Sequence, residues 1–297
     1  MNSWMIWTIV RQSASEWIED NAPRLSAALA FYTILSVTPL MIIFVAVTGF
    51  VFGEDVASGK LISQLRDVFG EAGAEVVKTV IEKTDRPAEG LVATIVGVVT
   101  LLIGASGIFG ELQGALNTVW NVKPKAGRGF VGILRDRFLS FGMVLVVGFL
   151  LLVSLVLTAL LTAFGEYLEG LVTGLPLLMQ IGNFVLSFFL IAALFAMIFK
   201  FLPDVKIGWR DVWFGALVTS FLFTLGKFLI GFYLGKAGVA TPFGAAGSLV
   251  AFVIWIYYSA LILFFGAELT QVTMKQFSRN IEPTDNAEIA VHEKPGR

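Results

Sequence analysis

The sequence predicts an all-α integral membrane protein: a six-transmembrane-helix bundle with both termini cytoplasmic and an extracytoplasmic amphipathic helical loop between helices 1 and 2. Of its 297 residues, 57% are hydrophobic and 14% are charged, whereas soluble domains average about 25% charged residues. The apolar runs are continuous and do not alternate with polar residues, which indicates helices rather than a β-barrel. The composition and the apolar runs therefore indicate that most of the chain lies in a membrane.

Six segments are long enough to cross the membrane, since a helix needs roughly twenty apolar residues to span about 30 Å. Together they form one membrane domain over residues 24–270. In order, they are residues 25–52, 91–120, 138–165, 177–200, 212–235 and 245–270. Glycine pairs at four-residue spacing predict close helix contacts at Gly49/Gly53, Gly110/Gly114 and Gly231/Gly235.

Both ends of the chain differ in composition from this domain. Residues 1–23 lack the pattern of a signal peptide, and Trp4, Trp7 and Trp17 suit a helix in the headgroup layer. A frayed terminus fits residues 1–23 equally well. Residues 271–297 are too polar to bury a core, which predicts a disordered cytoplasmic tail.

Basic residues in the loops predict the orientation. The second and fourth loops are rich in lysine and arginine and the third has neither, which places both termini in the cytoplasm. The long first loop conflicts with this rule because it also carries five basic residues. Its apolar residues recur at helical spacing, which predicts two short amphipathic helices outside the membrane. The basic residues are Lys123, Lys125, Arg128, Arg135 and Arg137 in the second loop, Lys200, Lys206 and Arg210 in the fourth, and Lys60, Arg66, Lys78, Lys83 and Arg86 in the first.

The first and fifth predicted spans contain polar residues with two interpretations each. Tyr32, Ser36 and Pro39 share one face of the first span. Since proline removes a backbone hydrogen bond, the stripe is either a packing kink or the lining of a substrate path. Lys227 lies inside the apolar part of the fifth span, where it is either functional or snorkels toward the headgroups.

Glu111 and Glu268 are expected at cytoplasmic helix ends. Twenty apolar residues precede Glu111, and Asn117 follows on an amphipathic extension of the same helix. The two glutamates predict either an ion network with Arg24, Lys200 or Arg210, or the inner mouth of a path. Catalytic, metal and cofactor sites are not expected, because the chain has no cysteine and its one histidine, His292, lies in the polar tail.

Four sequence phrases together resemble the YihY/virulence factor BrkB family of bacterial inner-membrane proteins, formerly labelled ribonuclease BN. The resemblance implies a multi-pass protein of the bacterial inner (plasma) membrane with six helices and both termini cytoplasmic, and movement of lipids or lipid-linked precursors. No nucleophile and base that would support the ribonuclease label can be assembled. The phrases are RLSAALAFYTILSVTPL (24–40), GIFGELQGALNTVWNV (107–122), FLPD (201–204) with WRDVWFGAL (209–217), and FGAAGSLVAFVIWIYYSALILFFGAELT (243–270).

Two functions follow as expectations. The first is a transporter or flippase of lipids or lipid-linked envelope precursors, which needs a polar path for a headgroup beside an apolar path for the acyl chains. The second is a non-transporting membrane scaffold for envelope integrity or virulence partners. A ribonuclease or other enzyme is not expected. The expected partners are membrane lipids and either a second copy of the chain or an envelope protein, while a net charge of −1 without a basic stripe gives no sign of nucleic-acid binding.

Overall fold

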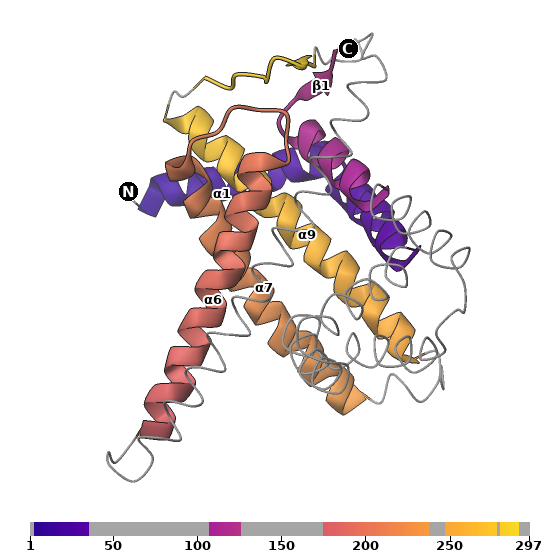
Figure 1. The fold of residues 1–297 in the computed structure, drawn as a ribbon, viewed down its shortest axis with the longest axis vertical. Helices are drawn as coiled ribbons and strands as arrows, with labels where there is room; N and C mark the ends of the chain where they lie inside the picture. Colours follow the sequence, from indigo (N-terminus) through magenta and orange to yellow (C-terminus); the bar gives the residue numbers. More distant parts are fainter. Residues whose placement is uncertain (1–2, 36–106, 126–174, 238–246, 278–279, 291–297) are drawn as a thin grey trace, which may run out of the picture. The chain divides into compact units, whose positions relative to one another are not determined.

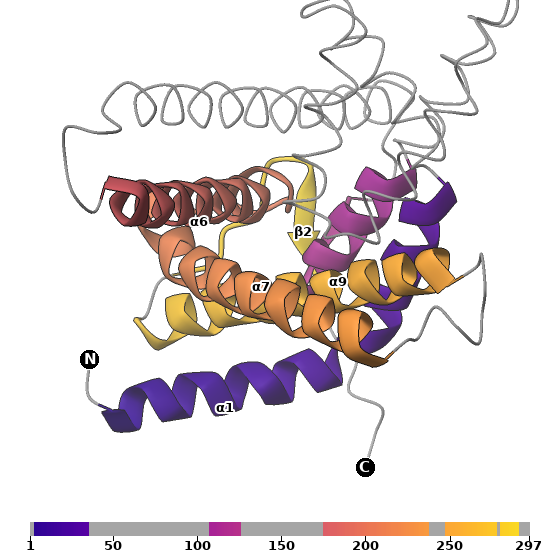
Figure 2. The same cartoon turned by 90° about the horizontal axis from the view of Figure 1, so that it is seen from below.

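A computed structural model describes residues 3–35, 107–125, 175–237, 247–277 and 280–290, and within these ranges the chain is mainly helical (Figures 1 and 2). The N-terminal residues form helix α1 (Ser3–Glu19), which is followed by helix Ala22–Leu35. Three long helices and two short strands complete the described part, together with a helix over residues 107–119. These are strand β1 (Val122–Pro124), helices α6 (Leu175–Phe201), α7 (Trp209–Ala237) and α9 (Gly247–Gln276), and strand β2 (Ala287–Ile289).

Three of the predicted membrane spans are confirmed as long apolar helices. The segments long and apolar enough to cross a membrane are Gln180–Phe201, Trp209–Ile230 and Val250–Gln276, and they correspond to the spans expected at 177–200, 212–235 and 245–270. The span expected at 138–165 lies outside the described residues. So do the first extracytoplasmic loop, Ser36 and Pro39.

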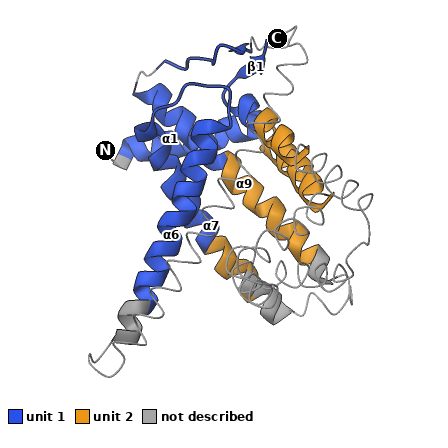
Figure 3. Ribbon diagram, in the orientation of Figure 1, with its two compact units in different colours: residues 1–20, 116–224, 265–297 blue, residues 21–115, 225–264 orange. Residues whose placement is uncertain are grey.

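The chain divides into two compact units (Figure 3). Unit 1 contains residues 1–20, 116–224 and 265–297, and unit 2 contains residues 21–115 and 225–264. At the boundary after α1, Asn21 has a φ angle of 55°, in the left-handed region that asparagine tolerates better than most residues. The backbone carbonyl of Asn21 then accepts hydrogen bonds from the amides of Arg24 and Leu25 as the next helix begins.

In unit 1, α6 packs on α7 through aromatic rings and one buried hydroxyl. The rings of Phe195 and Phe223 meet edge to face at 5.7 Å between centroids. Nearby, the Ser220 hydroxyl donates to the backbone carbonyl of Phe188 at 2.9 Å. This bond satisfies a polar group that would be costly to leave unpaired inside a membrane helix pair.

Helices α7 and α9 approach each other where a glycine of each faces a threonine of the other. A Cβ atom at Gly215 would overlap the hydroxyl of Thr270, and a Cβ atom at Gly266 would overlap the hydroxyl of Thr219. Both hydroxyls bond within their own helix, Thr219 to the Gly215 carbonyl at 2.7 Å and Thr270 to the Gly266 carbonyl at 2.8 Å. Small residues therefore allow the close contact that helices in membranes use in place of hydrophobic burial.

Helix α1 packs across the polar end of this pair. Ile9 is buried with Leu269 and Val272 of α9, and Phe214 and Val218 of α7 pack against the same cluster. The N-terminal residues thus form an ordered helix with one buried face. The expectation of a frayed terminus does not hold for residues 3–19.

Unit 2 has its own small core. Ala30 is buried with Phe252 and Ile256, and Ile34 and Tyr257 pack against them. By contrast, a Cβ atom at either Gly110 or Gly114 would meet nothing within 4 Å among the described residues. The predicted close contact at this glycine pair stays a prediction.

The expected tail differs from the structure in two ways. Helix α9 continues to Gln276 rather than ending at residue 270, because α1 covers the polar turns that follow the apolar run. Further on, β2 pairs antiparallel with β1, and Val122 is opposite Ile289. The backbone of residues 280–290 also bonds to residues 204 and 206, so this segment is ordered by hydrogen bonds that its composition does not reveal.

Candidate functional site

Buried polar side chains concentrate on one stretch of α9. Glu268, Thr270 and Gln271 each have an exposed fraction of 0%, and they lie within the candidate membrane span Val250–Gln276. The sequence predicts Glu268 at a helix end. The structure corrects this, because α9 continues for two further turns and α1 covers the glutamate.

The charged groups that act on Glu268 come from α1, the residue after it and α9. The carboxyl of Asp20 faces that of Glu268, Glu16 adds a second negative charge, and Lys275 supplies the positive one. Neither carboxylate oxygen of Glu268 receives a hydrogen bond from a donor among the described residues. Buried carboxyl groups usually have such a donor, so this arrangement requires an explanation.

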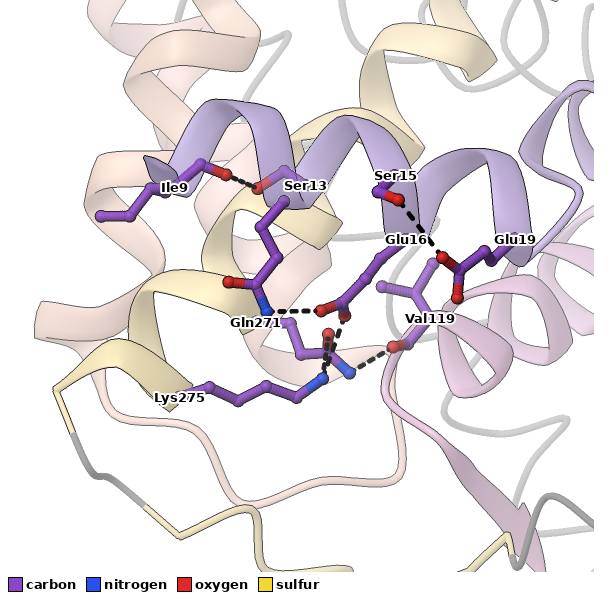
Figure 4. A network of polar contacts seen from close by, with 9 residues as sticks. Ile9, Ser13, Ser15, Glu16, Glu19, Val119, Gln271 and Lys275 are labelled. Atoms are coloured by element: carbon purple, nitrogen blue, oxygen red, sulfur yellow. Dashed lines mark hydrogen bonds and ion pairs between the residues drawn. The ribbon is translucent and has the colours of Figure 1, made fainter. Parts of the chain in front are cut away.

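A chain of polar contacts extends from this point toward the surface (Figure 4). The ammonium of Lys275 donates to the carboxylate of Glu16 and to the amide oxygen of Gln271, at 3.0 Å in both cases. The amide nitrogen of Gln271 in turn donates to the backbone carbonyl of Val119. These contacts connect α9, α1 and the end of the helix over residues 107–119.

We expect Gln271→Met to destabilise the protein by about 1 to 2 kcal/mol, since it leaves the buried Val119 carbonyl without its donor. Lys275→Met is the matched comparison. Because Lys275 and Glu16 are both partly exposed, losing their ion pair is expected to cost less than about 1 kcal/mol. Unfolding titrations in detergent measure both changes, and a larger loss for Lys275→Met would contradict this order.

A second polar contact lies in the same unit. The buried amide of Asn117 donates to a carboxylate oxygen of Asp204 at 2.9 Å and accepts a bond from the Asp204 backbone amide at 2.8 Å. The apolar face predicted for this helix is confirmed, since Leu112, Leu116 and Val119 are buried. Asn117 is therefore held by both of its polar atoms.

Lys200 is surrounded by aromatic rings at the end of α6. Its ammonium lies 5.6 Å and 5.3 Å from the ring centroids of Phe201 and Trp209 and donates to the Ile207 carbonyl at 2.6 Å. Arg210, beside Trp209, is exposed. The structure thus gives Lys200 other partners than the glutamates with which sequence analysis grouped it.

The remaining predicted site residues belong to unit 2. Arg24 and Tyr32 are exposed, Glu111 and Lys227 are half-buried, and the ring of Tyr32 lies against Gly107. The predicted network that joins Glu111 and Arg24 to Glu268 stays a prediction. The neighbours of Glu268 that were not predicted from the sequence are Asp20, Glu16, Gln271 and Lys275. A usable signal was Gln271 and Lys275 recurring at helical spacing after Glu268.

The arrangement brings charged and polar side chains together around one buried carboxyl group. No group of three histidine, cysteine or acidic residues in the described ranges is placed to hold a metal ion. What it offers is a carboxyl group enclosed by protein within a membrane segment, a position that marks ion or substrate pathways in membrane proteins.

Comparison with known proteins identifies the relatives of the chain. The family model described as Virulence factor BrkB matches residues 13–290. A UPF0761 membrane protein of Ralstonia nicotianae is 28% identical over 256 residues, which cover 84% of this chain and 55% of the relative. A UPF0761 membrane protein of Mannheimia succiniciproducens is 26% identical over 262 residues, which cover 86% of this chain and 85% of the relative.

The chain spans between 55% and 62% of the length of the first relatives, those of Ralstonia, Pseudomonas and Verminephrobacter. No solved structure matches it significantly. Since the family model matches almost the whole chain and the relatives are named membrane proteins, the chain belongs to the BrkB virulence factor family of bacterial membrane proteins.

Proposed function

We propose that this protein moves lipids or lipid-linked envelope precursors across the bacterial inner membrane, as a transporter or flippase and not as an enzyme. One observation carries the proposal: within unit 1, α6 and α7 expose apolar side chains, and α6 ends in a cationic and aromatic cluster at Lys200, Phe201 and Trp209. An amphiphile needs these two environments next to each other, one for its acyl chains and one for its headgroup.

The exposed apolar side chains are large and would be unfavourable in water. Ile181, Phe184, Val185 and Phe189 of α6 and Phe221 of α7 are between 44% and 59% exposed. Exposed apolar side chains of this kind on candidate membrane spans suit contact with acyl chains.

The headgroup region of the proposal is the end of α6 and the start of α7. Arg210 is exposed there, next to Trp209 and to the ring-covered ammonium of Lys200. Arginine binds phosphate oxygens through paired donors, and indole rings favour the headgroup layer. These groups fit an anionic lipid headgroup.

The proposal places both termini in the cytoplasm and α1 along the inner headgroup layer. Trp4 and Trp7 of α1 are 76% and 66% exposed, and Ile18 is 67% exposed. An amphipathic helix that buries one face in protein and exposes tryptophan on the other suits the membrane interface.

Purified protein in vesicles with a labelled lipid in one leaflet tests this function. We expect it to speed headgroup translocation over empty vesicles. At limiting lipid, Arg210→Gln should slow it roughly tenfold, because a charge-assisted hydrogen bond contributes about 1.5 kcal/mol. Lys206→Gln, which removes an exposed charge paired with Asp285, is the control. No acceleration across several lipid classes would exclude the function.

The second candidate is a membrane scaffold for envelope or virulence partners, or for a second copy of the chain. It is favoured by the β1–β2 sheet, where Ile289 is 60% exposed on a segment outside the membrane spans. Exposed apolar strand residues are typical of surfaces that bind an added strand. Crosslinking from a residue beside Ile289 should then yield one partner in stoichiometric amount. Vesicles that contain the protein should translocate lipid headgroups no faster than empty vesicles.

A further inference from the structure

Glu268 is enclosed by protein and lacks a hydrogen-bond donor. Its exposed fraction is 0%, and neither oxygen has a donor among the described residues. An ionised carboxylate in such a place would lose its hydration without compensation, which is among the costliest arrangements in a protein.

The carboxyl group that faces Glu268 is that of Asp20. Two ionised carboxylates repel each other because both are negatively charged. They form no hydrogen bond because both offer acceptors only. When one of them carries a proton, its O–H donates to the other, and Glu268 gains a hydrogen-bond partner. The geometry of this pair is therefore favourable with one proton and unfavourable with none.

The other charges around the pair oppose each other, and the negative ones favour the bound proton. Glu16, one turn before Asp20, adds a negative charge, and Lys275 adds a positive one. Lys275 is already held by Glu16 and Gln271. The pair also lies at the C-terminal end of α1, whose last turn contains no basic residue. Because the carbonyl end of a helix is electrically negative, that position disfavours a second carboxylate.

We propose that Glu268 and Asp20 form a proton-binding site in which the two carboxyl groups share one proton. The proton comes from water and returns to water on release, which changes the charge of the pair from −1 to −2. This site does not depend on lipid movement. Its consequence is that the contact between the end of α1 and α9 is stabilised by the bound proton and weakened when the proton leaves.

Infrared difference spectroscopy of the full chain in lipid tests the site, because a protonated carboxyl group has a carbonyl band that shifts in D₂O. The spectrum of Glu268→Gln, subtracted from that of the unchanged protein at neutral pH, should reveal this band. Asp20→Asn should remove the same band. Both variants keep a donor between the two side chains and should fold. The control is Glu19→Gln, an exposed acid of the same helix end, which should leave the band intact.

Loss of the band in both variants supports the shared proton. Absence of any such band from the Glu268→Gln difference overturns it. A band lost in Glu268→Gln but kept in Asp20→Asn also overturns the pair, because Glu268 then holds a proton alone. If Glu268→Gln does not fold, the Asp20→Asn difference decides alone: presence of the band supports the pair, and its absence refutes it.

Discussion

Gly266→Ala should destabilise the protein by about 3 kcal/mol, at the upper end of the cost of overpacking a core. The added Cβ would overlap the hydroxyl of Thr219 and lie 3.0 Å from its Cβ and 3.1 Å from a ring atom of Phe199. Since α9 is helical on both sides of this position, relief requires α7 and α9 to separate. Unfolding titrations in detergent measure the loss.

The matched control is Gly182→Ala in α6, where a Cβ would meet nothing within 4 Å among the described residues. Replacing glycine by alanine in an open helical position stabilises the helix by up to about 1 kcal/mol. We therefore expect the two substitutions to change stability in opposite directions. Equal stabilities for Gly266→Ala and the unchanged protein would refute the close contact.

Double variants give a sharper test, because a Cβ atom at Gly266 and one at Gly215 would overlap different kinds of atoms. Thr219→Ala should restore much of the stability of Gly266→Ala, since the overlapping atom is the hydroxyl. Thr270→Ala should restore less in Gly215→Ala, whose Cβ would also lie 2.6 Å from the backbone carbonyl of Gly266. A backbone atom cannot be removed by substitution, and that difference sets the order of the two rescues.

The membrane helices could be predicted because hydrophobic length is a local property. The predicted starts of α6, α7 and α9 agree with the structure to within about three residues, and so do the predicted ends of α6 and α7. These predictions required no knowledge of neighbouring helices. The end of α9 could not be predicted in the same way. Thr270 and Gln271 read as the boundary of an apolar run, yet both are buried because α1 packs over them.

The candidate site was predictable in part for the same reason. Asn117 and Glu268 attract notice as polar groups beside apolar runs, but their partners lie far away in the sequence. Nothing near Glu268 indicates Asp20. The close contact of α7 and α9 could not be predicted from glycine pairs within one helix, because each helix places a glycine against a threonine of the other.

The second large loss of stability is expected when the contact between Asn117 and Asp204 is removed. Asn117→Leu keeps the side-chain volume similar but removes both hydrogen bonds to Asp204, one of which ends on a carboxylate. We expect a loss of about 3 kcal/mol, since hydrogen bonds to charged groups contribute about 1.5 to 3 kcal/mol each. Unfolding titrations in detergent measure this loss as well.

The position of Asp204 makes the effect of Asn117→Leu larger than one lost contact. The Asp204 carbonyl accepts from the Thr284 amide, and Lys206 bonds to Glu282 through the backbone, so residues 204–206 hold the segment that leads into β2. Releasing Asp204 should therefore raise hydrogen exchange in residues 282–289 while α6 stays protected. Asp204→Asn is the control, because it keeps the backbone amide that donates to Asn117 and a side-chain oxygen that can accept from it. If Asn117→Leu left exchange in β2 unchanged, the Asn117–Asp204 contact would not be what orders this segment.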